Sequence, residues 1–148
     1  MVIEDRILIA APAARVWDIV ADPIRMASLS PEVDKVEWVG EPGSQHGATF
    51  LGHNRVGPVR WTTANIVEIA EQSNAFGWRA VEGNERCVSR WTYRIEEQHG
   101  GCEVLERYES VGWMATAECL LGRAWMLRRG MRETLRRLKI AAEHAAPR

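Results

Sequence analysis

The spacing of hydrophobic positions changes twice along the chain. Residues 2–10 can form a β-strand with Ile3, Ile7 and Ile9 on one face. From residue 33 to residue 112 the period is mostly two, in segments separated by turn-forming stretches such as EPGSQHG and QHGG. Short connections between consecutive strands are typical of an antiparallel meander. We therefore expect one early strand and, later, a run of about six antiparallel strands.

Two short helices are predicted between these β segments. In PAARVWDIVADPI, Pro12 suits a first helical turn because its missing N–H costs nothing there, and the helix should run to about Ala21. Pro23 disfavours helical geometry at Asp22. A second short helical segment, IRMASLS, follows. Trp17 and its aliphatic neighbours are expected to be buried.

A long helix is predicted over residues 116–142, where the hydrophobic period becomes 3.6. An antiparallel sheet with one apolar face must cover that face, and this helix is the only predicted element large enough to do so. The two short helices would close the wedge between sheet and helix. The apolar stripe of the long helix comprises Ala117, Leu120, Leu121, Ala124, Leu127, Met131, Leu135, Leu138 and Ala142.

Composition narrows the class of protein. The chain has 148 residues, enough for one domain with a sizeable core, and its formal net charge of -1 argues against a nucleic-acid partner. No apolar run reaches transmembrane length, which excludes integral membrane association but leaves peripheral contact open. The N-terminus has acids where an export signal needs bases. Three cysteines without a CxxC motif suggest neither disulfides nor a metal site, and we expect no cofactor. These features predict a cytoplasmic protein, either a monomer or a homodimer.

Several stretches resemble a known superfamily. IAAPAARVWDIVADP, LSPEV, GATFLGHNRVGPVRW, SRWTYRIEE and ERYE are similar to the START-like helix-grip superfamily (SRPBCC), in its polyketide cyclase/dehydrase and lipid-transport branch. The resemblance covers nearly the whole chain. It implies an α+β helix-grip fold, in which a curved seven-stranded antiparallel sheet wraps around a long C-terminal helix, with two short helices after the first strand. It also implies a single domain over residues 1–145.

The same resemblance implies a cavity between sheet and helix. Members of the superfamily bind lipids, sterols, polyketides or other apolar molecules there, and some are cyclases or aromatases. Catalytic residues differ between branches, so no motif carries them over to this chain.

Alternation within the strands predicts which side chains face such a cavity. In CVSRWTYRIEE, Cys87 shares the inner face with Ser89 and the residues at every second position after it, whereas Val88 is outward. In VRWTTANIVEIA the inner set runs from Val59 to Ile69. The predicted ligand-binding residues are Trp38, Phe50, Asn54, Trp61, Thr63, Asn65, Phe76, Trp78, Ser89, Trp91, Tyr93, Glu106, Tyr108, Leu121, Ala124 and Arg128.

Two interpretations remain open for these inner faces. The tryptophans either form the wall of an apolar pocket or simply fill the curved sheet. The polar members either line a partly polar cavity or reach solvent at strand ends, because buried polar groups need partners.

Arg128 lies in the apolar stripe of the long helix. A guanidinium there must meet an anion or extend to solvent. It would either face the cavity and bind a ligand carboxylate or ketone, or be turned outward by a bend near Gly122 or Gly130.

The first hypothesis for function is non-catalytic binding of a small, largely apolar ligand such as a lipid, sterol or polyketide-like molecule. The alternative is a cyclase, aromatase or dehydratase in the same cavity, with Tyr93, Glu106 and Arg128 as acid, base and oxyanion candidates. A third is a macromolecular interaction through the basic stretch RRGMRETLRRLK, which resembles a membrane-surface helix but is more typical of a solvated face.

Overall fold

The structure is a computed structural model that describes residues 1–144. The predicted end of the domain at residue 145 lies outside these described residues. The elements in chain order are β1 (Val2–Ile9), α1 (Ala13–Val20), α2 (Pro23–Ala27), β2 (Val33–Val39), β3 (Thr49–Val56), β4 (Val59–Glu71), β5 (Ala75–Glu82), β6 (Arg86–Gln98), β7 (Gly101–Ser110), α3 (Gly112–Leu120) and α4 (Arg123–Glu143).

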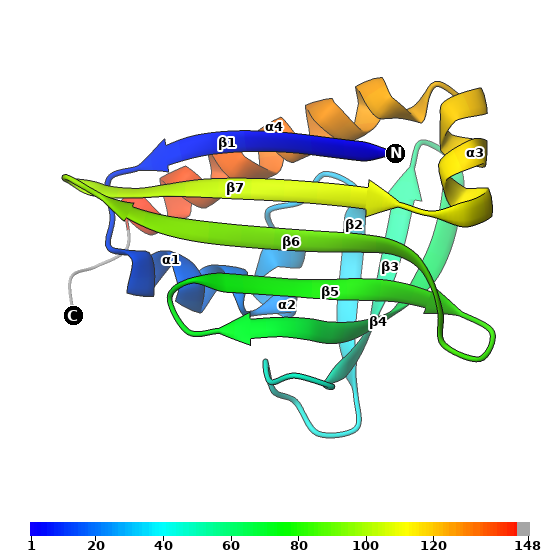
Figure 1. Cartoon of the computed structure of the whole chain (residues 1–148), viewed down its shortest axis with the longest axis horizontal. Helices are drawn as coiled ribbons and strands as arrows, with labels where there is room; N and C mark the ends of the chain where they lie inside the picture. The colour runs from blue at the N-terminus through cyan, green and yellow to red at the C-terminus, as the bar shows by residue number, and fades with distance from the viewer. Residues whose placement is uncertain (145–148) are drawn as a thin grey trace.

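The strands form one seven-stranded sheet in the order β1-β7-β6-β5-β4-β3-β2, with every neighbouring pair antiparallel. Strands β2 to β7 are a meander, and β1 joins its far edge beside β7. The sheet curves strongly and α4 runs along it, with α1 and α2 at one end (Figure 1). The predicted helix-grip fold and the expected strand count are therefore confirmed.

Irregular pairings break the alternation that the sequence predicts. The register shifts between Ala80 and Val81 where β5 meets β6, so that Val88 and Ser89 are both buried on the concave side. The prediction that Val88 faces outward is wrong for this reason. A second shift, in β4 between Val67 and Ile69, places Ala70 rather than Ile69 against the main core.

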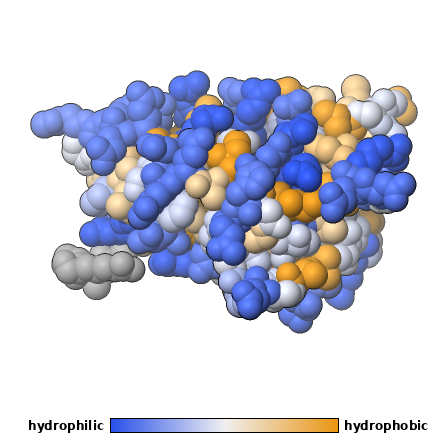
Figure 2. All heavy atoms as spheres, turned by 60° about the horizontal axis from the view of Figure 1, so that its bottom comes forward, coloured by the Kyte–Doolittle hydropathy of each residue, from blue (hydrophilic) through white to orange (hydrophobic). Residues whose placement is uncertain are grey.

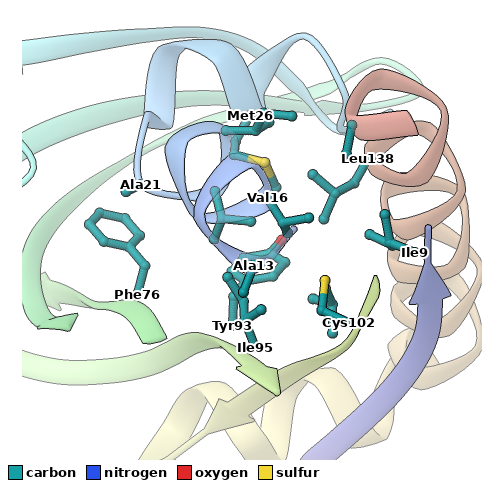
Figure 3. Close-up of a cluster of buried hydrophobic side chains, with 14 of the residues drawn as sticks. Ile9, Ala13, Val16, Ala21, Met26, Phe76, Tyr93, Ile95, Cys102 and Leu138 are labelled. Carbon is teal, nitrogen blue, oxygen red and sulfur yellow. The ribbon is translucent and has the colours of Figure 1, made fainter. Parts of the chain in front are cut away.

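Helix α1 fills one end of the wedge between the sheet and α4. Its apolar face is buried, and Trp17 is half-buried rather than fully enclosed, with its indole N–H donating to the carbonyl of Ala75 at 3.2 Å. The Asp22 carboxylate accepts from the backbone N–H of Arg25 and begins α2. Figure 3 shows how side chains from α1, α2 and the strands meet Leu138 of α4 in one cluster.

The C-terminal helix is broken, which corrects the prediction of one continuous helix over residues 116–142. α3 ends at Leu120, and Gly122 adopts a left-handed conformation with φ of 65° before α4 begins. Such a φ strongly favours glycine. The stripe of α4 that begins with Leu127 is buried against the sheet, but Leu120 and Leu121 are exposed at the break. Within the described chain no helix is long and apolar enough to span a membrane.

Candidate ligand-binding cavity

A cavity of about 570 Å³ lies between the concave face of the sheet, α3 and α4. This volume is within the usual range for small-molecule sites. Its lining is mainly apolar and aromatic, with a few polar groups contributed by the strands β3, β4, β6 and β7, by α3 and α4, and by the segment before β2.

The structure brings most of the sequence-predicted residues together in this lining. Trp38 and Phe76 instead pack within or against the main core, and Ala124 packs against a smaller cluster that includes Leu127. The predicted residues that do line the cavity are Phe50, Asn54, Trp61, Thr63, Asn65, Trp78, Ser89, Trp91, Tyr93, Glu106, Tyr108 and Leu121.

Arg128 does not face the cavity, which corrects the hypothesis that it binds a ligand there. Its side chain is exposed and it is absent from the lining. The buried stripe of α4 is centred on Leu127, Met131 and Leu138, so Arg128 lies at the edge of that stripe, from which its long stem reaches solvent. The break at Gly122 also separates it from Leu121, whose position had suggested a wider stripe.

One wall of the cavity is a row of aromatic rings on neighbouring strands. Phe50 meets Trp78 edge-on at a centroid distance of 5.6 Å, and Trp78 stacks with its cross-strand partner Trp91 at 6.4 Å. Trp91 in turn contacts Tyr108, its partner on β7, at 4.6 Å. Such contacts stiffen the wall and present a flat, apolar surface to a ligand.

Tyr93 and Glu106 form a buried polar pair in the same wall. The Tyr93 hydroxyl donates to Glu106 Oε1 at 2.7 Å, whereas Glu106 Oε2 has no partner within the described residues. Burial raises the pKa of Glu106 to about 8, more than the hydrogen bond from Tyr93 lowers it. Burial also raises the pKa of Tyr93 well above its ordinary value. At neutral pH the glutamic acid therefore holds a proton that its free oxygen can offer to the cavity.

A second pair of the same type was not predicted. The Tyr108 hydroxyl donates to Glu118 Oε1 from α3, and Glu118 Oε2 is buried without a partner among residues 1–144. Burial, together with the bond to Glu118, raises the pKa of Tyr108. Glu118 was missed because a charged residue beside the apolar stripe is expected at the surface, whereas α3 turns it toward the cavity together with Ala117 and Leu121 of that stripe.

A polar patch surrounds Gly52 on β3 and β4. The amide nitrogen of Asn65 donates to the carbonyls of Phe50 and Thr63, and the amide nitrogen of Asn54 lies within hydrogen-bonding distance of the Thr63 hydroxyl. A Cβ on Gly52 would lie 3.0 Å from that hydroxyl. With their N–H groups occupied, the asparagines retain carbonyl oxygens that can accept hydrogen bonds.

An ion pair lies at the mouth of the cavity. Arg123, the first residue of α4, makes two hydrogen bonds of 2.8 and 2.6 Å to the carboxylate of Glu32. Its guanidinium also lies over the ring of Trp61 at 5.8 Å. The bonds to Glu32 raise the pKa of Arg123. The cationic group of the cavity lining is thus Arg123, whereas the sequence pattern predicts Arg128 for this role.

Among residues 1–144 there is no group of three or more His, Cys, Asp or Glu side chains that could hold a metal ion.

Comparison with known proteins places the chain in a family. The family described as "Polyketide cyclase / dehydrase and lipid transport" matches residues 1–143. No curated protein matches the sequence.

Solved structures have the same fold. The Polyketide_cyc-like protein Cgl2372 from Corynebacterium glutamicum is 27% identical, with a TM-score of 0.57 over 97% of this chain and 89% of that one. The ZhuI aromatase/cyclase from a Streptomyces species is 18% identical, with a TM-score of 0.74 over 97% and 93%. The di-domain aromatase/cyclase StfQ of the steffimycin biosynthetic pathway is 13% identical, with a TM-score of 0.75 over 96% of this chain and 50% of that one. The family match over almost the whole length, supported by these folds, shows that the chain belongs to the polyketide cyclase/dehydrase and lipid transport family.

Proposed function

We propose that this protein binds one small, largely apolar molecule with a flat ring system in the cavity between sheet and helices. The observation that carries the proposal is the continuous aromatic wall from Phe50 to Tyr108. Each 100 Å² of apolar ligand surface removed from water there would contribute about 2.5 kcal/mol. The structural likeness to aromatase/cyclases, whose names imply ring-forming chemistry, supports the same class of ligand.

The polar groups of the cavity favour a ligand that carries oxygen atoms. The protonated carboxyl of Glu106 would donate to a ligand carbonyl through Oε2, which has no partner within residues 1–144. The amide oxygens of Asn54 and Asn65 would accept from a ligand hydroxyl. Satisfying these groups stabilises the complex because a buried polar atom without a partner is costly.

Binding can be tested with anthraquinone and anthracene, which have the same ring system with and without carbonyl oxygens. Both compounds should quench tryptophan fluorescence when they bind. Anthraquinone should bind about tenfold more tightly, because its carbonyl oxygen can accept a hydrogen bond that anthracene cannot. Ala80→Phe adds a ring inside the cavity and should abolish binding, because Ala80 is buried in the lining. Ala64→Phe is the matched control, because Ala64 is on the neighbouring strand β4 and its side chain lies on the face of the sheet away from the cavity. If neither compound binds, or if both variants bind equally, the proposal fails.

A second candidate is catalysis of ring closure in the same cavity, and Glu106 is the observation that favours it. An acid with a pKa of about 8 and a free oxygen is suited to proton transfer near neutral pH. Glu106 would donate its proton to the ligand carbonyl as the carbon–carbon bond forms. The proton lost from the attacking methylene carbon would restore the acid.

Binding and catalysis are separated by Glu106→Gln. This variant keeps the shape and a hydrogen-bond donor but cannot transfer a proton. With a short poly-β-ketone as substrate, a catalytic role predicts cyclised or dehydrated product from the wild type and at least a hundredfold loss of rate in the variant. Retained anthraquinone binding in both proteins without any product would leave binding as the function.

A further inference from the structure

Exposed apolar side chains gather around the mouth of the cavity. In the described chain eleven large hydrophobic residues are exposed. Four of them, Val59, Trp61, Trp113 and Leu121, line the cavity, and two more, Leu120 and Trp125, flank Leu121 at the break between α3 and α4. We call these six the apolar rim. The remaining five are dispersed over β1, α2, β2 and α4. Figure 2 shows hydrophobic patches among hydrophilic atoms, several of them toward the right, the end at which α3 lies in Figure 1.

The break between α3 and α4 projects the most exposed members of the rim. Leu120 and Leu121 each have 81% of their surface exposed, and Trp125, one turn into α4, has 64%. The left-handed Gly122 ends one helix and begins the next, so these side chains protrude at a corner and do not fold back onto the core. Such protrusion is unfavourable in water and indicates a partner.

Basic residues continue from this corner along α4. Arg128, Arg129 and Arg132 follow Trp125 at positions i+3, i+4 and i+7, and all three side chains are exposed outside the buried stripe of α4. Within residues 1–144 Arg128 and Arg129 form no ion pair, whereas Arg132 pairs with Asp5 at 3.5 Å. The Arg129 guanidinium lies 5.7 Å from the centre of the Trp125 ring. This part of the surface thus combines protruding apolar side chains with the unpaired positive charges of Arg128 and Arg129.

We propose that the apolar rim and these arginines dock the protein onto the surface of a membrane that contains anionic lipids, with the mouth of the cavity toward the bilayer. Leucine and tryptophan would enter the interfacial layer, where tryptophan is favoured. The arginines would lie at the headgroups and interact with lipid phosphates. The far-protruding side chains of Leu120, Leu121 and Trp125 suit insertion between lipids better than the flat, closely packed interface of a protein partner. The proposal does not depend on the ligand or reaction assigned to the cavity.

The test is partitioning of the whole protein onto vesicles by flotation. One set of vesicles contains phosphatidylcholine alone and the other a mixture of phosphatidylcholine and phosphatidylglycerol. The wild type should bind the mixed vesicles, with an affinity that falls as salt is added. A polarity-sensitive dye attached to Cys119, which is exposed on α3, should report a less polar environment when the protein binds the vesicles. Cys87 is replaced with serine beforehand, because it is partly accessible.

Two variants separate the apolar and basic contributions. Leu120→Ser/Leu121→Ser should reduce partitioning onto mixed vesicles by about tenfold or more. Its control, Leu8→Ser/Val39→Ser, changes two exposed apolar residues away from the mouth and should have no effect. Arg128→Gln/Arg129→Gln should also reduce partitioning about tenfold, whereas Arg94→Gln, exposed on β6, should not.

The docking proposal is overturned if the wild type binds neither type of vesicle, a result that would leave the rim to a protein partner. It is equally overturned if the Leu8/Val39 control loses as much binding as the Leu120/Leu121 variant. Circular dichroism of each variant distinguishes lost docking from lost folding.

Discussion

Tyr93 and Glu106 are directly opposite each other on β6 and β7, and the phenolic hydroxyl donates to the carboxyl at 2.7 Å. Cross-strand pairing fixes the distance between the two side chains, and both are buried from bulk solvent in the cavity wall. The raised pKa of Glu106 follows from this placement. Because one carboxyl oxygen stays without a partner in the described chain, the pair links the stability of the fold to the chemistry of the cavity.

Glu106 should make the protein less stable as pH rises. Its ordinary pKa is 4.5, and the fold raises it to about 8. Between these values the folded state holds a proton that the unfolded state has lost, so the free energy of unfolding falls with rising pH by roughly 5 kcal/mol in all. Glu106→Gln cannot lose a proton and should remove this decline. Urea unfolding of both proteins at several pH values measures it.

The difference between the two unfolding curves isolates Glu106 from other groups. Carboxylates with lowered pKa values, such as Glu133, act at acidic pH and in the opposite direction. They are present in both proteins and cancel. Wild-type and Glu106→Gln stabilities that run parallel from pH 5 to pH 8 would contradict the buried, protonated state of Glu106.

Tyr93→Phe should raise the pKa of Glu106 further. The tyrosine hydroxyl donates to the carboxyl and lowers its pKa, so removing the hydroxyl leaves burial unopposed by that bond. The lost hydrogen bond should also cost about 1–3 kcal/mol of stability. NMR titration of the labelled glutamate carboxyl measures the first effect. Tyr108→Phe, which removes the other tyrosine hydroxyl of the cavity, should leave the Glu106 titration unchanged, and an equal shift in both variants would be inconsistent with a direct bond.

The strands could be predicted because hydrophobic residues recur at every second position, which is also the period with which side chains alternate between the two faces of a sheet. Trp78 and Trp91 lie on inner positions by parity alone, and the sheet makes them cross-strand partners. Parity fails at Val88, where an extra residue in the pairing turns two successive side chains inward. A bulge has no marker in the spacing of hydrophobic residues, so only the register reveals it.

The C-terminal helices were predicted less well than the strands. A continuous stripe predicted that Leu121 and Arg128 face the same side, but Gly122 interrupts the helix and resets the angular phase. Glu118 and Arg123 enter the cavity lining through that break, and Glu32 enters through a loop that has no period at all. Gly122 was the available signal, since glycine favours the left-handed conformation that ends a helix.

Gly101 should not tolerate a side chain. A Cβ at this position would lie 2.0 Å from the carbonyl oxygen of Ile9, a backbone atom held by the pairing of β1 with β7. Gly101→Ala should therefore destabilise the protein by about 3 kcal/mol or more. At the neighbouring Gly100 a Cβ meets nothing within 4 Å, and only its left-handed φ of 84° opposes alanine, at a cost of about 1–2 kcal/mol. Equal midpoints of urea unfolding for the two variants would show that β1 moves away at little cost.

Glu32 should determine whether Arg123 can bind an anionic ligand. The two hydrogen bonds between them neutralise the guanidinium at the mouth of the cavity. Glu32→Gln removes the negative charge and should raise the affinity for anthracene carboxylate relative to anthracene methanol by about tenfold to hundredfold, through one charge-assisted hydrogen bond. Isothermal calorimetry measures both affinities. Glu32→Gln/Arg123→Gln should abolish the gain, and Arg128→Gln should leave the ratio at the wild-type value because Arg128 is outside the cavity. If the double variant kept the gain, a group other than Arg123 would be the anion-binding residue.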